Sequence, residues 1–171
     1  NYRADMIIIA FFLNPVAVGL YSIAVSLAER LWIISKSVST VLFPKIASLD
    51  NDNDKNMITS VISRVVMAIS ILSGIAVYFI ADLLIFLLFG SDYEGSVNAL
   101  KWLLPGIVLG SMERIISNDI AGRGKPEINM YTSIFSVIVN IILNILLIPH
   151  YGINGAAIAT TITYTLNWIL K

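Results

Sequence analysis

Long apolar stretches, separated by short polar segments, fill almost the whole chain. A helix needs roughly 20 apolar residues, at about 1.5 Å each, to cross a hydrocarbon core about 30 Å thick. Measured against that length, the pattern predicts a partial membrane span followed by a series of complete ones. We place the spans at residues 1–13 (partial), 18–43, 57–80, 97–120, 127–148 and 153–170.

The same pattern predicts where helices bend or turn. The apolar run over residues 57–89 is too long for one upright span, so we expect a break or an interfacial segment near Ala81 and Asp82. Pro105, which is followed by glycine, predicts a kink inside its span. Residues 149–152 begin with proline and end with glycine, which predicts a tight turn between the last two spans.

The composition supports a membrane protein. Of the 171 residues, 57% are hydrophobic and 13% are charged, and the mean hydropathy is +0.84. A soluble domain of this size would need a more charged surface, whereas these charges collect in short patches between apolar runs. We therefore expect one all-α transmembrane domain over residues 1–171, a polytopic bundle of about six helices. Because both ends fall in or against apolar runs, we also expect it to be part of a larger protein.

The basic residues of the loops fall in alternate loops, which predicts the orientation in the membrane. One set of loops holds most of the Lys and Arg residues, whereas the other set holds Asp92 and Glu94. Lys and Arg are enriched on the cytoplasmic side of membrane proteins. The basic loops and the C-terminus should therefore be cytoplasmic. The basic set comprises Lys45, Lys55, Arg64, Arg123, Lys125 and Lys171.

Several ionisable side chains fall inside the predicted spans. A charge at the centre of a membrane helix costs about 2.5–3.5 kcal/mol on insertion scales, and such residues usually face a water-filled path. They are therefore candidates for a transport site. The alternative is that they form permanent pairs between helices, with a purely structural role. The candidates are Arg3, Asp5, Glu29, Arg30, Glu113 and Arg114.

Two of the spans also carry polar side chains at helical spacing. Residues three, four or seven apart share one helix face, so these stripes predict one side toward lipid and one toward a polar interior. The stripes are Ser22, Ser26, Glu29, Lys36 and Thr40, and Asn129, Ser133, Ser136, Asn140 and Asn144. Hydroxyls and amides also join neighbouring membrane helices without binding a ligand, which is the alternative for each of them. Gly155, Ala159 and Thr163, four apart, are typical of a close-packed helix contact.

The sequence contains no pattern for a cofactor, a metal ion or nucleic acid. It has no Cys, its one histidine, His150, lies in a predicted turn, and it has no HExxH motif. No P-loop is present, and the acidic segment around Asp52 and Asp54 lacks the spacing and glycine of an EF-hand. No basic patch with interleaved aromatic residues indicates nucleic acid. We therefore expect no resident cofactor, no metal site and no enzymatic activity.

Several stretches resemble the C-terminal half of Wzx-type polysaccharide (O-antigen) flippases. These proteins belong to a superfamily that also contains multidrug and toxic-compound extruders and the lipid II flippase. The resemblance covers nearly the whole chain, with the motifs in the same order. The motifs are LNPVAVGLYSIAVSLAERL, VLFPKIASL, LLFGSDYEGSVNALKWLLPG, NDIAGRGKPEI and VNIILNILLIPHYGINGAAIATTITY.

The resemblance implies a two-lobed helical transporter in the cytoplasmic (inner) membrane of a prokaryote, with the first lobe missing from this chain. Its cargo would be an oligosaccharide on a polyprenyl diphosphate, used to build surface polysaccharide such as O-antigen, lipopolysaccharide or capsule. The diphosphate brings about two negative charges, which need cations and hydrogen-bond donors in the cavity. We therefore expect Arg3, Arg30 and Arg114 to bind the diphosphate, and Asn140 and Asn144 to bind sugar hydroxyls.

Asp5 and Glu29 are the candidates for ion coupling. Uptake of H⁺ or Na⁺ there would bias the transporter toward one open state, since a ligand shifts an equilibrium only through differential binding. A drug or metabolite cation antiporter of the same superfamily is the nearest alternative, and carboxylates without matching arginines would favour it. A membrane-embedded polysaccharide polymerase is a second alternative, although it would need a larger loop or a catalytic carboxylate cluster. A structural membrane subunit is a third, although charges deep in at least three helices speak against it.

Overall fold

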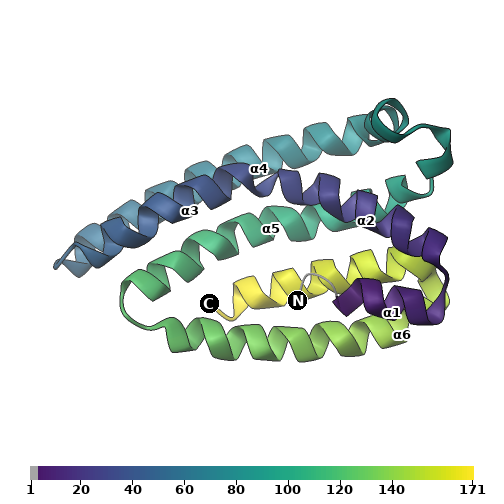
Figure 1. Ribbon diagram of the computed structural model, residues 1–171. Helices are drawn as coiled ribbons and strands as arrows, with labels where there is room; N and C mark the ends of the chain where they lie inside the picture. The colour runs from purple at the N-terminus through teal and green to yellow at the C-terminus, as the bar shows by residue number, and fades with distance from the viewer. Residues whose placement is uncertain (1–3) are drawn as a thin grey trace.

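The computed structural model describes residues 4–171, which form an all-α bundle (Figure 1). The predicted fold class, a helical membrane bundle, is therefore confirmed. The helices are α1 (Ala4–Phe12), α2 (Pro15–Arg30), α3 (Trp32–Ala47), α4 (Asp52–Phe89), α5 (Ser96–Gly122) and α6 (Pro126–Ile169), with a short 3-10 helix, η1 (Ser91–Tyr93).

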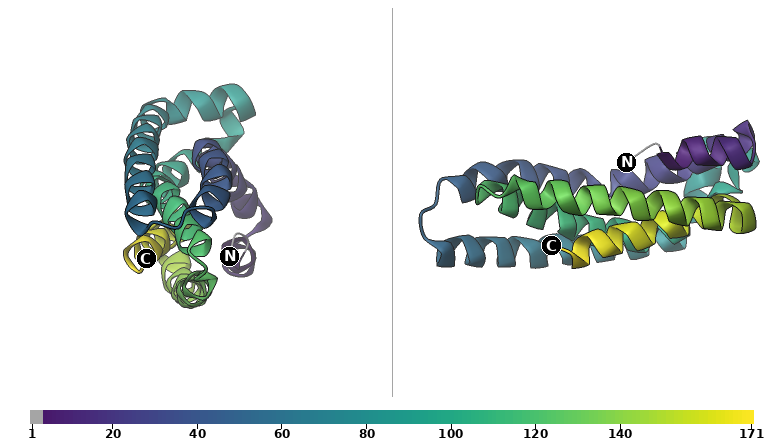
Figure 2. Two further views of the ribbon diagram at one scale, coloured as in Figure 1. Left: turned by 90° about the vertical axis from the view of Figure 1, so that its left-hand side faces the viewer. Right: turned by 90° about the horizontal axis from the view of Figure 1, so that it is seen from below.

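The helices lie along one long axis, so the links between them gather at the two ends of the bundle (Figures 1 and 2). The α3–α4 and α5–α6 links lie at one end, which we call the basic end because Lys45, Arg123 and Lys125 lie in or beside them. The α1–α2 and α4–α5 links lie at the opposite end, which carries Asp92 and Glu94. The alternation of charge along the sequence thus becomes a separation in space.

The predicted helix over residues 18–43 is in fact two helices, α2 and α3, bent by 50° at Leu31. Neither proline nor glycine occurs at the bend, so no local signal in the sequence marks it. Next to the bend, the Trp32 side chain is buried, and its indole N–H donates to the Ile107 carbonyl of α5 at 2.9 Å. The prediction of one continuous helix was wrong. The contact between Trp32 and α5 at the bend joins residues far apart in the sequence, so no local pattern records it.

Two other positions where we expected an irregularity lie inside continuous helices. α4 continues through Asp82, so a break there was wrong, and an interfacial segment stays a prediction. The carboxylate lies at the surface and pairs with Lys101 of α5 at 2.8 Å, so it stays solvated within a helix about 57 Å long. α5 likewise continues through Pro105 as one helix. In the turn that this proline interrupts, the Thr161 hydroxyl donates to the Trp102 carbonyl at 2.6 Å.

α5 lies at the centre of the bundle and contacts α2, α3, α4 and α6. Two glycines of α5, four residues apart, permit this packing. A Cβ atom on Gly106 would lie 2.7 Å from the Thr161 Cα, and one on Gly110 would lie 3.1 Å from the Trp32 ring. Side chains at these two positions would therefore push α5 away from α6 and α3.

α6 reverses direction at Gly152, whose φ of 58° and ψ of −140° are not helical. Two antiparallel arms result, residues 126–151 and residues 153–169 (Figure 1). The predicted turn between the last two spans is therefore confirmed. Gly155 packs directly against the Leu147 carbonyl, where a Cβ atom would overlap, so the expected close contact is also confirmed at this glycine.

α4 and α6 are long and apolar enough to cross a membrane, and the bent α2–α3 pair also qualifies if it is counted as one span. Their outer faces carry large exposed apolar side chains, as a surface in contact with lipid does. The number of complete spans stays a prediction. Examples of these side chains are Leu72, Phe79, Leu83 and Leu87 on α4, and Ile134, Ile138, Ile142 and Leu146 on α6.

Candidate functional site

A buried carboxylate, Asp5 of α1, is the centre of one group of polar side chains. Only 6% of Asp5 is exposed. The Tyr21 hydroxyl of α2 donates to Asp5 Oδ2 at 2.7 Å, and it lies 3.3 Å from the Thr160 hydroxyl on the second arm of α6. Together with Glu29 and Asn140, which line the same space, these residues form what we call the Asp5 cluster.

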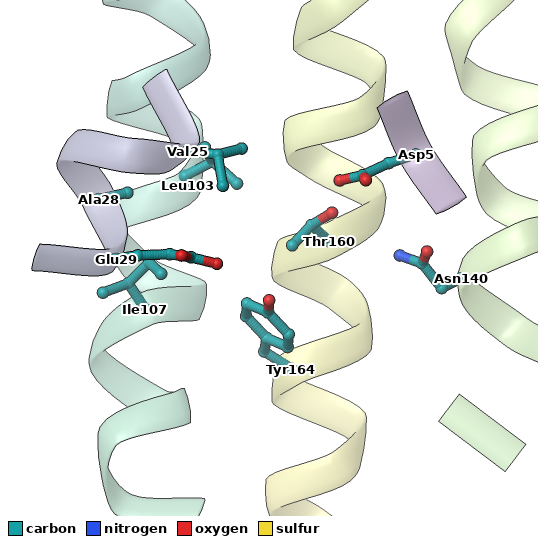
Figure 3. Close-up of a pocket in the computed structure, with 9 residues that line it drawn as sticks. All are labelled: Asp5, Val25, Ala28, Glu29, Leu103, Ile107, Asn140, Thr160 and Tyr164. Atoms are coloured by element: carbon teal, nitrogen blue, oxygen red, sulfur yellow. The ribbon is translucent and has the colours of Figure 1, made fainter. Parts of the chain in front are cut away.

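A cavity of about 20 Å³ lies within the Asp5 cluster (Figure 3). Asp5 and Glu29 approach it from opposite sides with their carboxylates pointing inward, and Thr160 and Asn140 lie near Asp5. A space of this size accommodates one water molecule. Carboxylate, hydroxyl and amide oxygens are also the ligands that hard cations prefer. The cavity is therefore suited to hold a proton or a small cation.

Asn140 and Asn144 extend this polar interior along the first arm of α6. Asn144 Nδ2 donates to Asn140 Oδ1 at 3.0 Å, and Asn140 Nδ2 donates to Thr163 Oγ1 at 3.3 Å. Both asparagines are buried, and Asn144 is completely so. Asn144 therefore fixes the orientation of Asn140, and Asn140 presents its side chain to the cavity.

A second polar region lies in the half of α5 nearer to the basic end, around Arg114. The Arg114 guanidinium carbon lies 4.0 Å from the centre of the Trp32 ring, a cation–π contact. The Trp32 ring in turn contacts the Tyr164 ring, with 5.5 Å between their centres. All three side chains line a cavity of about 310 Å³, to which Ser133 and Ser136 also contribute. Because Tyr164 lines this cavity and the Asp5 cavity, it lies between the two.

Glu113, the neighbour of Arg114, is held in a network with the end of the chain. Its Oε1 atom forms an ion pair with Lys171 and accepts hydrogen bonds from Ser117 at 2.7 Å and Asn167 at 3.2 Å. The contacts of Glu113 are therefore those of a structural pair between helices, the alternative to a transport role.

The structure brings some of the predicted site residues together and separates others. Asp5, Glu29 and Asn140 share one cavity, although Asn140 was expected to bind sugar. Arg30 is exposed as the last residue of α2, beside the bend, and Arg114 lines the other cavity. Arg3 lies outside the described residues.

Aromatic and hydroxyl residues of the site were missed in the sequence. Tyr21 lies eight residues before Glu29, so helical periodicity alone would have placed both on one face. Thr160 and Tyr164, four apart, carry the same signal. No signal pointed to Trp32, because its position depends on the bend at Leu31.

A bundle that combines membrane-length helices with charged side chains in its interior is characteristic of polytopic membrane transporters. The model of the family described as lipid II flippase MurJ matches residues 5–171, and the chain belongs to this family. The resemblance to flippases that the sequence motifs indicated is thereby confirmed.

Three relatives illustrate the range of proteins to which the chain is similar. It is 30% identical to the probable low-salt glycan biosynthesis flippase Agl15 of Haloferax volcanii, over 97% of the chain and 36% of the relative. It is 30% identical to the capsular polysaccharide biosynthesis protein CapF of Staphylococcus aureus, over 77% of the chain and 34% of the relative. It is 22% identical to a putative O-antigen transporter of Shigella flexneri, over 97% of the chain and 40% of the relative.

The chain therefore spans well under half the length of these relatives. No solved structure matches it with significance.

Proposed function

We propose that this chain forms one lobe of a flippase that moves a polyprenyl-diphosphate-linked oligosaccharide across a prokaryotic cytoplasmic membrane for surface polysaccharide synthesis. The observation that carries the proposal is the family match over residues 5–171. The names of the relatives, which include glycan flippases and an O-antigen transporter, support the class of cargo. A further part of the protein supplies the opposite lobe, and the basic end faces the cytoplasm.

The Asp5 cluster is the proposed coupling site. A proton or Na⁺ in the 20 Å³ cavity would neutralise charge between Asp5 and Glu29, with Thr160 and Asn140 as further oxygen donors. Three separate helices, α1, α2 and α6, carry these groups. Occupancy therefore favours the packing in which the three helices close around the ion, and loss of the ion releases them.

The proposed cargo site uses Arg30 and Arg114. Arg30 is exposed at the end of α2, where it can reach a diphosphate in a cavity shared with the opposite lobe. Guanidinium groups bind phosphate oxygens through two parallel hydrogen bonds, which fix the orientation of the headgroup, and their positive charge balances that of the phosphate. The bend at Leu31 and the reversal at Gly152 are the proposed hinges for rocking one lobe against the other.

Arg30→Ala in the full-length protein tests this function. Loss of one charge-assisted contact, worth about 1.5–3 kcal/mol, should lower export of surface polysaccharide at least about tenfold. Export is measured in cells that lack their own flippase, and the level of the variant in the membrane is measured by immunoblotting.

Arg64→Ala is the matched control, because Arg64 is an exposed arginine of α4. It should leave export unchanged. Full export by Arg30→Ala would remove Arg30 from the cargo site. Failure of the unmodified protein to move a lipid-linked oligosaccharide in proteoliposomes would overturn the function itself.

A further inference from the structure

A third cavity, of about 390 Å³, lies between α3 and the half of α5 nearer to the basic end. We call it the Lys36 pocket. Residues three and four apart share a helix face, so α3 and α5 each present one polar face to the pocket. Its lining residues are Lys36, Ser39 and Thr40 from α3, and Arg114 and Asn118 from α5.

We propose that the Lys36 pocket binds a phosphoryl group, such as the diphosphate of a lipid headgroup or a free pyrophosphate. This site is distinct from the Asp5 cluster and does not include Arg30. The proposal rests on the function proposed above, because it assigns a second contact to an anionic cargo near the basic end of the bundle.

The charge of the pocket matches an anion. Lys36 and Arg114 contribute two positive charges, and no carboxylate is among the residues that line it. The acidic residues nearest in sequence on α5 are bound elsewhere. Glu113 pairs with Lys171, and the carboxylate of Asp119 accepts hydrogen bonds from Arg123 at 2.8 Å and Thr59 at 2.7 Å. Neither acid offsets the two cations from within the pocket.

The hydroxyl of Ser39 is the second observation that points to a ligand. Ser39 is 5% exposed, and its Oγ atom makes no hydrogen bond to another described residue. Thr40, by contrast, donates its hydroxyl to the Lys36 carbonyl at 2.9 Å. A buried hydroxyl without a partner is costly, and a phosphoryl oxygen in the pocket would accept its hydrogen bond.

Arg114 is held in position for such a ligand. Its guanidinium stacks on Trp32, which is itself fixed by the hydrogen bond to the Ile107 carbonyl. The Asn118 amide donates to the Arg114 carbonyl at 2.9 Å, so the second α5 residue of the pocket is also anchored. Stacking restrains the long arginine side chain before the ligand arrives, which lowers the entropic cost of binding.

The proposal is tested by equilibrium binding to the full-length protein in nanodiscs. One arm titrates inorganic pyrophosphate, and the other compares phosphatidylcholine nanodiscs with and without added polyprenyl diphosphate. Lys36→Gln should weaken binding about tenfold, as expected for a lost charge-assisted hydrogen bond, and Ser39→Ala should weaken it by a smaller factor. Lys36→Arg should retain binding.

Lys45→Gln is the matched control, because Lys45 is an exposed lysine of α3 that does not line the pocket. Dependence on Lys36 and Ser39 in both arms supports a site for the phosphoryl group itself, and dependence in the lipid arm alone supports a site for the lipid-borne group. The proposal is overturned if neither probe binds, if Lys36→Gln and Ser39→Ala bind as the unmodified protein does, or if Lys45→Gln weakens binding equally.

A transport assay separates this proposal from the proposed function. Pyrophosphate binding that depends on Lys36, in a protein that moves no lipid-linked oligosaccharide, supports the pocket and refutes the flippase. Normal transport with binding that does not depend on Lys36 supports the flippase and refutes the pocket.

Discussion

The Asp5 cluster is carried by α1, α2 and α6, whereas the region around Arg114 is carried by α3, α5 and α6, and the two regions differ in size and in charge. In the Asp5 cluster, the Tyr21 hydroxyl joins the Asp5 carboxylate to the Thr160 hydroxyl beside a space for one water molecule. Around Arg114, two larger cavities of about 310 and 390 Å³ surround a guanidinium that stacks on an aromatic ring. We call the first the closed region, which holds two carboxylates, and the second the open region, in which Glu113 lines one cavity beside Arg114 and no carboxylate of the described residues lines the other.

The difference also extends to how completely the polar groups are satisfied. The Tyr21 hydroxyl contacts both Asp5 and the Thr160 hydroxyl, whereas Ser136 and Asn167 in the 310 Å³ cavity hold buried oxygens without a hydrogen-bond partner among the described residues. Closed networks favour one small ion, and open ones favour a larger polar ligand. Tyr164 lies between the two regions and lines a cavity of each.

Of the three substitutions that distinguish the two regions, Asp5→Asn should have the largest effect. It should lower the affinity for the coupling cation in the closed region and leave the open region unchanged. The amide keeps the size and the acceptor for Tyr21 but removes the charge, so affinity for the coupling cation should fall about a hundredfold. The measurement is the dependence of transport by the full-length protein on H⁺ and Na⁺ gradients.

Asp92→Asn, at an exposed carboxylate of η1, is the control for Asp5→Asn and should leave the cation dependence unchanged. Cation dependence that survives Asp5→Asn would rule out the Asp5 cluster as the coupling site.

Tyr21→Phe should have the next largest effect, on stability. It removes a buried hydroxyl that contacts both Asp5 and Thr160, and a hydrogen bond to a charged group contributes about 1.5–3 kcal/mol. The free energy of unfolding in detergent should fall by about 2 kcal/mol. Tyr131→Phe, at a tyrosine that is 66% exposed, should leave it unchanged. Equal stability of the two variants would mean that the closed network adds nothing to folding.

Trp32→Phe should have the smallest effect of the three, and it should act on the open region. It removes the indole hydrogen bond to Ile107 and weakens the contact with Arg114, for a loss of about 1–2 kcal/mol in the free energy of unfolding. Trp102→Phe is the matched control, because Trp102 is 53% exposed. If Trp32→Phe unfolds at the same temperature as the unmodified protein, the contacts of Trp32 with Ile107 and Arg114 do not stabilise the fold.

Much of the fold followed from patterns that act over one or two helical turns. The apolar runs predicted the helices, the proline–glycine turn predicted the reversal at Gly152, and the loop charges predicted which links share an end. The acids of the closed region were also recognised, because a carboxylate inside an apolar run is conspicuous. The break expected at Asp82 does not occur, because a charged residue at an exposed position, here paired with Lys101, is compatible with a continuous helix.

By itself, the sequence determined that this chain is a helical membrane protein with ionisable groups in its interior, because hydropathy and spacing are properties of each helix alone. Only the tertiary structure decided that the polar stripe on residues 22–40 divides into two sites. The bend at Leu31 sends Glu29 to the Asp5 cavity and Lys36 to a pocket with Arg114. The physical reason is that the bend accompanies packing of Trp32 against α5, a contact between residues 75 positions apart that no local pattern records.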